Sequence, residues 1–320
     1  MSSSAESGRD SQTITLSSYR TLGFAEYGSP TGYPLIYFHG FPSSRLEGEI
    51  LHKAARKRNI RVVAPDRPGF GLSTYDPNYT ITSWVEDVRE LVKQLNLQRF
   101  AVLGLSGGGP YALACAKDLP ASMMTSVGVA VGSPYWAEGG FGDMPWWSRI
   151  SYWLVKYAPG PATLLVSGLV GVTRLVTGTS WGKRMIDKAV EAERKKQKEK
   201  GESNQLGGMD PLQGEPIEES RQGLLRALFE PFTQGSKPTI RELKLFTIDW
   251  GFELKEVGYD KVMMWGGTKD VNAPISGVRY IASAVQHSEL REYEGSHGEI
   301  VTQVDDILDT LVPEEARHLL

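Results

Sequence analysis

A serine stands in a pattern that is typical of activated hydroxyl groups. Gly104-Leu-Ser-Gly-Gly108 is a G-x-S-x-G motif, and it lies between a short apolar run and a segment with helical periodicity. Small residues around the serine let the chain turn tightly, so that the Ser106 hydroxyl is held above the end of a strand. The next backbone N–H, that of Gly107, then points at the same space. The motif predicts a nucleophilic Ser106, with a purely structural glycine turn as the alternative.

A serine nucleophile requires a base, and one of the five histidines is well placed to be one. His297 follows the last expected strand, in Glu294-Gly-Ser-His-Gly298. Its loop therefore lies at the same sheet edge as Ser106, where it could take the serine proton and return it to a leaving group. A structural histidine is the alternative. Of the others, His52 is expected on a helix and His318 in the C-terminal tail. His287 is expected at the opposite sheet edge, and His39 in a hydrogen bond that braces a loop.

A carboxylate should orient that imidazole and stabilise its protonated form. Asp270 ends a run that begins at Lys261, just past a strand and before a helix that starts at Pro274. A role in a turn or as a helix cap is the alternative for Asp270. Other acids lie at the wrong end of that strand or too close to His297: Asp249, Asp260 and Glu299. The chain order Ser106, Asp270, His297 is the order expected for a serine at a strand-to-helix turn.

Acyl transfer also creates an oxyanion, which needs backbone donors aimed at it. The N–H of Gly107 is one expected donor. The second should come from the sharp turn His39-Gly-Phe-Pro42. Because proline has no N–H, we assign the second donor to Phe41.

Short apolar runs alternate with helical segments along most of the chain. Expected strands are 33–38, 61–64, 99–103, 126–131, 261–265 and a more polar, edge-like 290–293; expected helices include 45–59, 83–97, 107–119 and 274–285. Such alternation predicts a mostly parallel sheet with helices on both faces. Ser83 is expected to cap its helix.

The alternation stops over residues 135–252, where six of the eight tryptophans lie. Helical runs there are expected near 145–157, 162–176, 180–200, 216–229 and 239–249. We expect a flexible leader over 1–12, a discontinuous core over 13–134 and 253–320, and a helical lid over 135–252. The lid aromatics either pack lid against core or contact substrate.

Composition narrows the class of protein. The 320 residues carry a formal charge of -3, without the basic excess typical of nucleic-acid binders, so no nucleic-acid partner is expected. The single cysteine, Cys115, cannot form an internal disulfide. The polar N-terminus is not expected to act as a signal peptide, and the uncharged stretch 157–173 is short and contains Pro159 and Pro161. We expect a soluble, cytoplasmic protein without membrane contact. Membrane or partner binding through the charged run 191–200 is the alternative, and the apolar helix 162–176 is expected to line an acyl pocket, with a lipid surface as the other reading. The oligomeric state stays open.

Motifs for other chemistries are absent from the sequence. It contains no G-x-x-x-x-G-K-[ST] phosphate loop, no H-E-x-x-H and no cysteine–histidine cluster. Neither a nucleotide nor a metal is therefore implied.

The combination of motifs closely resembles the α/β-hydrolase fold superfamily, in particular its lidded, single-chain fold-1 members. The resemblance covers about residues 20–134 and 250–311 and rests on 39–42, 66–73, 104–110, Asp270 and His297. It implies an eight-stranded, mostly parallel sheet, a Ser-His-Asp triad and no cofactor, with Asp66 and Arg67 bracing loops. Gly266 and Gly295-Ser296 depart from the usual pattern. Relatives that open epoxides or displace halide have aspartate where Ser106 stands, which argues against both reactions.

The expected function is hydrolysis of an ester, thioester, lactone or small amide through an acyl-enzyme on Ser106, with an apolar acyl substrate. Carbon–carbon bond hydrolysis, lyase or tailoring chemistry with the same triad is the alternative, because one fold supports many reactions. A ligand receptor with little turnover is the third reading.

Overall fold

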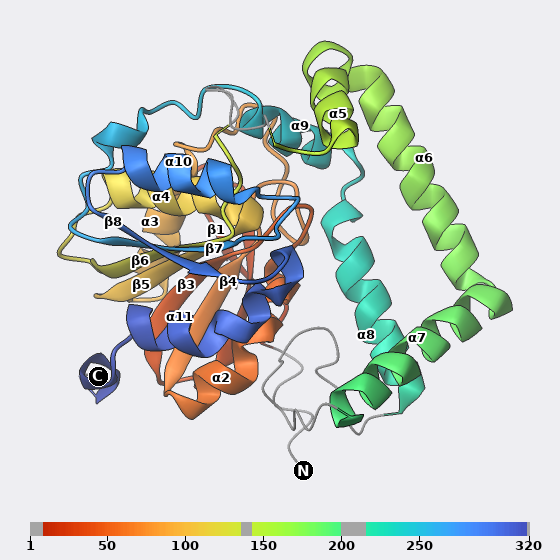
Figure 1. Cartoon of the computed structure of the whole chain (residues 1–320), viewed down its shortest axis with the longest axis horizontal. Helices are drawn as coiled ribbons and strands as arrows, with labels where there is room; N and C mark the ends of the chain where they lie inside the picture. Colours follow the sequence, from red (N-terminus) through yellow and green to blue (C-terminus); the bar gives the residue numbers. More distant parts are fainter. Residues whose placement is uncertain (1–8, 136–142, 200–215, 319–320) are drawn as a thin grey trace.

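The computed structural model describes residues 9–135, 143–199 and 216–318. Eight strands form one sheet in the order β1-β2-β4-β3-β5-β6-β7-β8 (Figure 1). The antiparallel part is β1 and β2 with β4, and the pairs from β4 through β8 are parallel. The predicted eight-stranded, mostly parallel sheet is confirmed.

The parallel strands coincide closely with the apolar runs of the sequence. They are β3 Tyr33–Phe38, β4 Ile60–Pro65, β5 Phe100–Leu105, β6 Met124–Ala130, β7 Val262–Gly267 and β8 Ser288–Tyr293. The more polar β8 is at the edge of the sheet, as its composition predicts. The strands β1 Gln12–Thr15 and β2 Thr21–Gly28 were not located by the sequence patterns. Their mixed sequences, QTIT and TLGFAEYG, lack a continuous apolar run.

Helices cover both faces of the sheet and bury two separate layers of apolar side chains. On one face lie α3 Trp84–Gln94, α4 Gly109–Asp118 and α10 Ile275–Ala284; on the other lie η1 Arg45–Leu51, α2 His52–Lys57 and α11 Val304–Leu311. Successive residues of β3 alternate between these layers: Ile36 and Phe38 join the first, Leu35 and Tyr37 the second. This alternation follows from the two-residue period of a strand.

Two local predictions are corrected. Ser83 does not cap α3 with its side chain, because its hydroxyl bonds Thr80 instead. Residues 1–8 of the expected leader lie outside the described residues, but Arg9 to Gln12 are held in place: Arg9 pairs with Glu26, and Gln12 begins β1. The described part of the chain is therefore tied to the core earlier than the predicted boundary at residue 13.

The segment between β6 and β7 contains α5 Trp146–Tyr157, α6 Pro159–Gly178, α7 Ser180–Glu199, α8 Ile217–Phe229 and α9 Lys237–Phe246. These helices lie beside the sheet, with α6 along the outer edge of the molecule (Figure 1). Tyr135 and Trp250, at the two ends of the segment, pack with ring centroids 4.6 Å apart, so the segment leaves and rejoins the core at one place. We refer to α5–α9 as the insertion. Trp136 lies outside the described residues.

Helix α6 is longer than the sequence pattern indicated. Pro159 and Pro161 belong to its first turn, where proline lacks only an N–H that would be unpaired anyway, so they do not interrupt it. Among the residues that the structure describes, α6 is the one helix long and apolar enough to cross a membrane by length and composition, with a mean hydropathy of 1.3.

Candidate active site

Ser106 occupies a strained turn directly after β5. Its φ is +49°, a left-handed conformation that is costly for a residue with a side chain. A Cβ on Gly104 would collide with the carbonyl of Gly108, and one on Gly108 would collide with the carbonyl of Phe38. The glycines of the motif are thus required by close backbone contacts, and they hold the hydroxyl at the carboxyl edge of the sheet.

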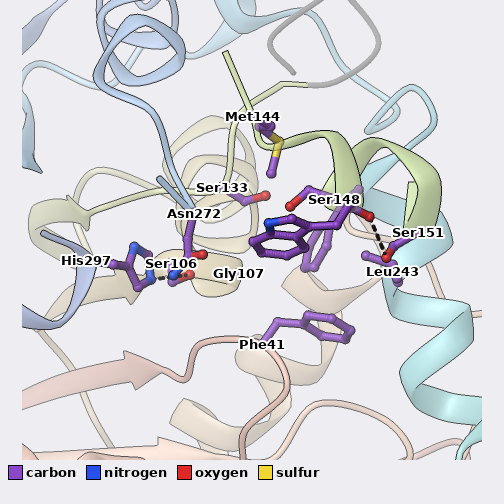
Figure 2. Close-up of a pocket in the computed structure, with 12 residues that line it drawn as sticks. Phe41, Ser106, Gly107, Ser133, Met144, Ser148, Ser151, Leu243, Asn272 and His297 are labelled. Atoms are coloured by element: carbon purple, nitrogen blue, oxygen red, sulfur yellow. Dashed lines mark hydrogen bonds between the residues drawn. The ribbon is translucent and has the colours of Figure 1, made fainter. Parts of the chain in front are cut away.

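His297 and Asp270, from loops after β8 and β7, reach the same point. The Nε2 atom of His297 lies 3.0 Å from the Oγ of Ser106, and its Nδ1 lies 2.7 Å from Oδ2 of Asp270. Figure 2 shows the imidazole beside the serine. Residues 191 positions apart are therefore brought into hydrogen-bond contact. Because the Asp270 carboxylate accepts from Nδ1–H, Nε2 is left as an acceptor for the serine hydroxyl.

Asp270 also performs the turn role that the sequence left as an alternative. Its side chain is fully buried, and its Oδ1 accepts from the backbone N–H groups of Asn272 and Ala273 at 2.8 and 2.9 Å. One oxygen thus fixes the loop while the other faces His297. The same carboxylate can do both because each oxygen has its own acceptor sites.

The competing residues lie elsewhere. Glu299 accepts from the backbone N–H and hydroxyl of Ser296, in a capping box at the start of η6 His297–Gln303. His287 precedes β8 at the opposite sheet edge. His39 is buried with its Nδ1 2.8 Å from the Gly40 carbonyl, the loop-bracing contact that the sequence predicted.

Phe41 and Gly107, the two expected oxyanion donors, come from neighbouring loops. A Cβ on Gly107 would lie 3.2 Å from the backbone nitrogen of Phe41, so these two main chains approach closely. The Phe41 ring also packs edge-on against Phe246 of α9, with centroids 5.4 Å apart. The loop that carries Phe41 therefore contacts both the serine turn and the insertion.

Buried charges brace this loop. The guanidinium of Arg67 donates to the carbonyls of His39 and Gly40, and its Nε donates to Glu242 of α9. Glu47 accepts from the Gly40 N–H. The resemblance suggested bracing by Arg67. Sequence reasoning missed Glu47 and Glu242, because no local pattern shows that a helical glutamate will meet a partner 175 residues away.

Burial shapes the ionisation of these groups. It raises the pKa of Glu47 and of Glu242, with the Gly40 N–H and Arg67 respectively opposing the shift. Burial also lowers the pKa of His39 well below its usual range, so that this imidazole is neutral and serves as a structural acceptor.

A cavity of about 320 Å³ opens beside the serine. Its walls combine core loops with α5 and α9, as Figure 2 shows. The lining residues are Phe41, Ser106, Gly107, Ser133, Met144, Trp147, Ser148, Ser151, Leu243, Phe246, Asn272 and His297. Its size suits a small ligand. Apolar and hydroxyl side chains share the walls, and no acidic or basic side chain besides His297 is among these residues.

Metal and thiol chemistry find no support in the described residues. Within them, no group of three or more His, Cys, Asp or Glu side chains could hold a metal ion. Cys115 is buried in α4, and burial raises the pKa of its thiol, which disfavours the reactive thiolate.

Comparisons with known proteins extend these observations. The sequence profile of the alpha/beta hydrolase family matches residues 35–294. An uncharacterized hydrolase of Saccharomyces cerevisiae is 29% identical over 162 residues, which are 46% of this chain and 52% of that protein. Proline iminopeptidase of Lactobacillus delbrueckii subsp. lactis is 29% identical over 132 residues, 39% of this chain and 42% of that protein. The chain thus spans about half the length of the curated relatives it matches.

Solved structures agree on the fold. An esterase from Exiguobacterium antarcticum has a TM-score of 0.61 with this chain, covering 94% of it and 98% of the esterase. The sequence identity in that match is 17%, so it shows the shared fold alone.

Proposed function

Because the chain belongs to the alpha/beta hydrolase family, we propose that it is a serine hydrolase that cleaves carboxylic esters through an acyl-enzyme on Ser106. The observation that carries this proposal is the hydrogen-bonded series Ser106–His297–Asp270 at the mouth of the cavity. The neighbouring esterase supports it only through the fold.

In the first half of the reaction, His297 Nε2 takes the proton of the Ser106 hydroxyl as Oγ attacks the ester carbonyl carbon. Asp270 stabilises the imidazolium that forms and keeps the ring oriented. The N–H groups of Phe41 and Gly107 hold the negative carbonyl oxygen. Collapse of the tetrahedral intermediate breaks the ester bond, and the proton on His297 passes to the departing alkoxide, which leaves as an alcohol.

In the second half, water attacks the acyl-enzyme. His297 accepts a proton from that water and then returns one to Ser106 Oγ as the acyl group leaves as a carboxylic acid. No cofactor takes part in these steps. The apolar wall formed by Phe41, Leu243 and Phe246 favours an uncharged acyl group in the cavity.

Turnover of p-nitrophenyl esters of several acyl lengths tests the proposal. We expect hydrolysis by the wild-type chain and a loss of at least about a thousandfold in kcat for Ser106→Ala. Ser151→Ala is the matched control, because it removes another hydroxyl from the cavity wall, and we expect its kcat to stay within about threefold. If the folded wild-type chain left every ester intact, the esterase proposal would fail.

A further inference from the structure

Helix α6 exposes an apolar side to the surroundings. Leu165, Leu169, Val172 and Val176 recur at spacings of four, three and four residues. Leu164 and Leu175 flank them, so the six residues lie along one side of the helix. Leu164 is 76% exposed, Leu169 66% and Leu175 73%. On the opposite side, Ala162 is buried against Val155 and Ile240. A helix that packs one apolar side and leaves another uncovered indicates an interaction surface.

The adjoining helices continue this character with aromatic residues. On α5, Trp146, Ile150, Trp153 and Tyr157 follow one another at spacings of four, three and four residues, and all are at least half exposed. Exposed Trp181 stands just beyond the other end of α6. Tryptophan and tyrosine favour the boundary between water and lipid, because their rings are apolar and carry a polar group. We call the exposed apolar residues of α5 and α6 the apolar face.

The charged residues of the chain segment that carries the apolar face are all cations. No Asp or Glu occurs between Asp143 and Asp187, although the chain has 38 of them. The cations in that stretch are Arg149, Lys156, Arg174, Lys183 and Arg184. The ammonium of Lys156 lies over the rings of its own helix, 5.6 Å from the centroid of Tyr157. Long cationic side chains beside apolar surface can cover it with their stems and keep their charge in water.

The ends of α6 decide how it could meet a membrane. Its N-terminal end is held by the Val155–Ala162–Ile240 cluster, whose Ile240 belongs to α9. Its C-terminal end continues into α7, where Asp187 pairs with Arg221 of α8 at 2.7 Å. The helix α8 is joined in turn to the core, through Arg226 and Asp10. Both ends of α6 are therefore tied to the core, so they would lie on the same side of a membrane. The helix therefore fits a position in the plane of a bilayer surface rather than across it.

We propose that the apolar face docks on the surface of an anionic lipid bilayer. The apolar side chains enter the boundary between headgroups and acyl chains, and the surrounding cations face the negative headgroups. This goes against the expectation from sequence that the protein makes no membrane contact. That expectation rested on the uncharged stretch being short and interrupted by prolines, whereas the structure continues it into the 20-residue helix α6 and exposes its apolar side.

Docking in this way would bring the cavity close to the bilayer. Trp147 and Ser151 of α5 line the cavity, while Trp146 and Trp153 of the same helix belong to the apolar face. An amphiphilic ester could then reach Ser106 from the membrane surface. This consequence rests on the proposed esterase function, but the docking itself does not.

Co-sedimentation of the full chain with vesicles tests the proposal. We expect binding to vesicles of phosphatidylcholine and phosphatidylglycerol to be at least about tenfold stronger than binding to phosphatidylcholine alone. The triple variant Leu164→Gln/Leu169→Gln/Leu175→Gln should bind at least about tenfold more weakly. Tyr19→Asn is the matched control, because it removes an apolar side chain that is 92% exposed elsewhere, and it should bind like wild type.

A second pair of variants separates charge from apolarity. Lys183→Gln/Arg184→Gln should weaken binding to the anionic vesicles by about tenfold, while the exposed pair Lys57→Gln/Lys93→Gln should not. Labelling of Ser106 by a fluorophosphonate, measured without vesicles, reports the proposed active site separately. If Ser106 is labelled but the protein does not bind vesicles, the docking proposal is contradicted and the proposed active site is not.

Two results would overturn the docking proposal. One is wild-type protein that stays in the supernatant with both vesicle types. The other is a stable dimer in light scattering that the triple glutamine variant dissociates, because the apolar face would then be covered by a second copy of the chain.

Discussion

The core and the insertion use apolar residues in opposite ways. In the core, alternate residues of each central strand are buried in two layers beneath helices, and Leu35, Ile36, Tyr37 and Phe38 are fully buried. In the insertion, the apolar residues of α6 face outward along most of the helix. The hydrophobic effect rewards burial in both places, but only the core supplies its own partner. The comparison shows that apolar sequence predicts burial without saying against what.

The largest effect is expected from removing the charge of Asp270, because the core holds this carboxylate against His297. We expect Asp270→Asn to lower kcat by at least about a hundredfold, because the amide cannot stabilise a protonated His297 as a carboxylate does. The change keeps an acceptor for the turn N–H groups of Asn272 and Ala273, so the fold should persist. Steady-state ester hydrolysis gives the number, and circular dichroism monitors the fold.

Glu299→Gln is the matched control for Asp270→Asn. Glu299 lies two residues from His297, but its carboxylate accepts from the backbone N–H and the hydroxyl of Ser296, so removing its charge should change kcat by less than about tenfold. Equal effects of the two variants would contradict the assignment of Asp270.

Leucine truncation compares the two regions directly. Leu308→Ala, in the buried layer of the core, should lower the free energy of unfolding by about 2–5 kcal/mol, because it leaves a cavity. Leu169→Ala, on the outer side of α6, should change it by less than about 0.5 kcal/mol in the absence of lipid. Urea titration followed by tryptophan fluorescence measures both. A large loss from Leu169→Ala would show that α6 is covered in solution.

Glu242→Gln tests the contact between the core and the insertion, because Glu242 of α9 pairs with Arg67 of the core. Neutralising Glu242 leaves the buried charge of Arg67 without its partner, which should cost about 1–3 kcal/mol of unfolding free energy. Since Arg67 holds the carbonyls of the loop that carries Phe41, kcat should fall more than KM rises. Glu253→Gln, which removes an exposed ion pair with Lys255, is the control. It should leave the free energy of unfolding, kcat and KM unchanged within error.

The smallest effect on the free energy of unfolding is expected from Asp309, which pairs with Arg58 and Arg317 on the core surface. Arg58 and Arg317 lower the pKa of Asp309 to about 2, with the Arg58 hydrogen bond contributing most. A lowered carboxyl pKa stabilises the fold above the unfolded value of 3.8, and this stabilisation is lost as pH falls toward 2. Because Asp309 is half exposed, Asp309→Asn should cost no more than about 1 kcal/mol at pH 7.

That difference should disappear by about pH 2, provided that unfolding is still measurable there. Chemical denaturation of both proteins at several pH values supplies the comparison. A cost that stays constant across the range would mean that Asp309 acts through packing instead of charge.

The sequence predicted the parts of the fold that follow local rules. The apolar runs of the central strands and the glycines around Ser106 can be recognised from a few neighbouring residues. The order of the chain segments then places Asp270 and His297 at the same sheet edge. The antiparallel β1 and β2 escaped because their sequences mix polar and apolar residues. Glu242 escaped because its partner is distant in sequence. The exposure of α6 escaped because its apolar residues also fit a buried helix.

The central claim is that Ser106 is the nucleophile, and fluorophosphonate labelling followed by peptide mass spectrometry tests it most directly. The account predicts a single covalent adduct, located on Ser106, that forms far more slowly in His297→Ala. A folded wild-type protein that takes up no label, or one that is labelled at another serine, would contradict it.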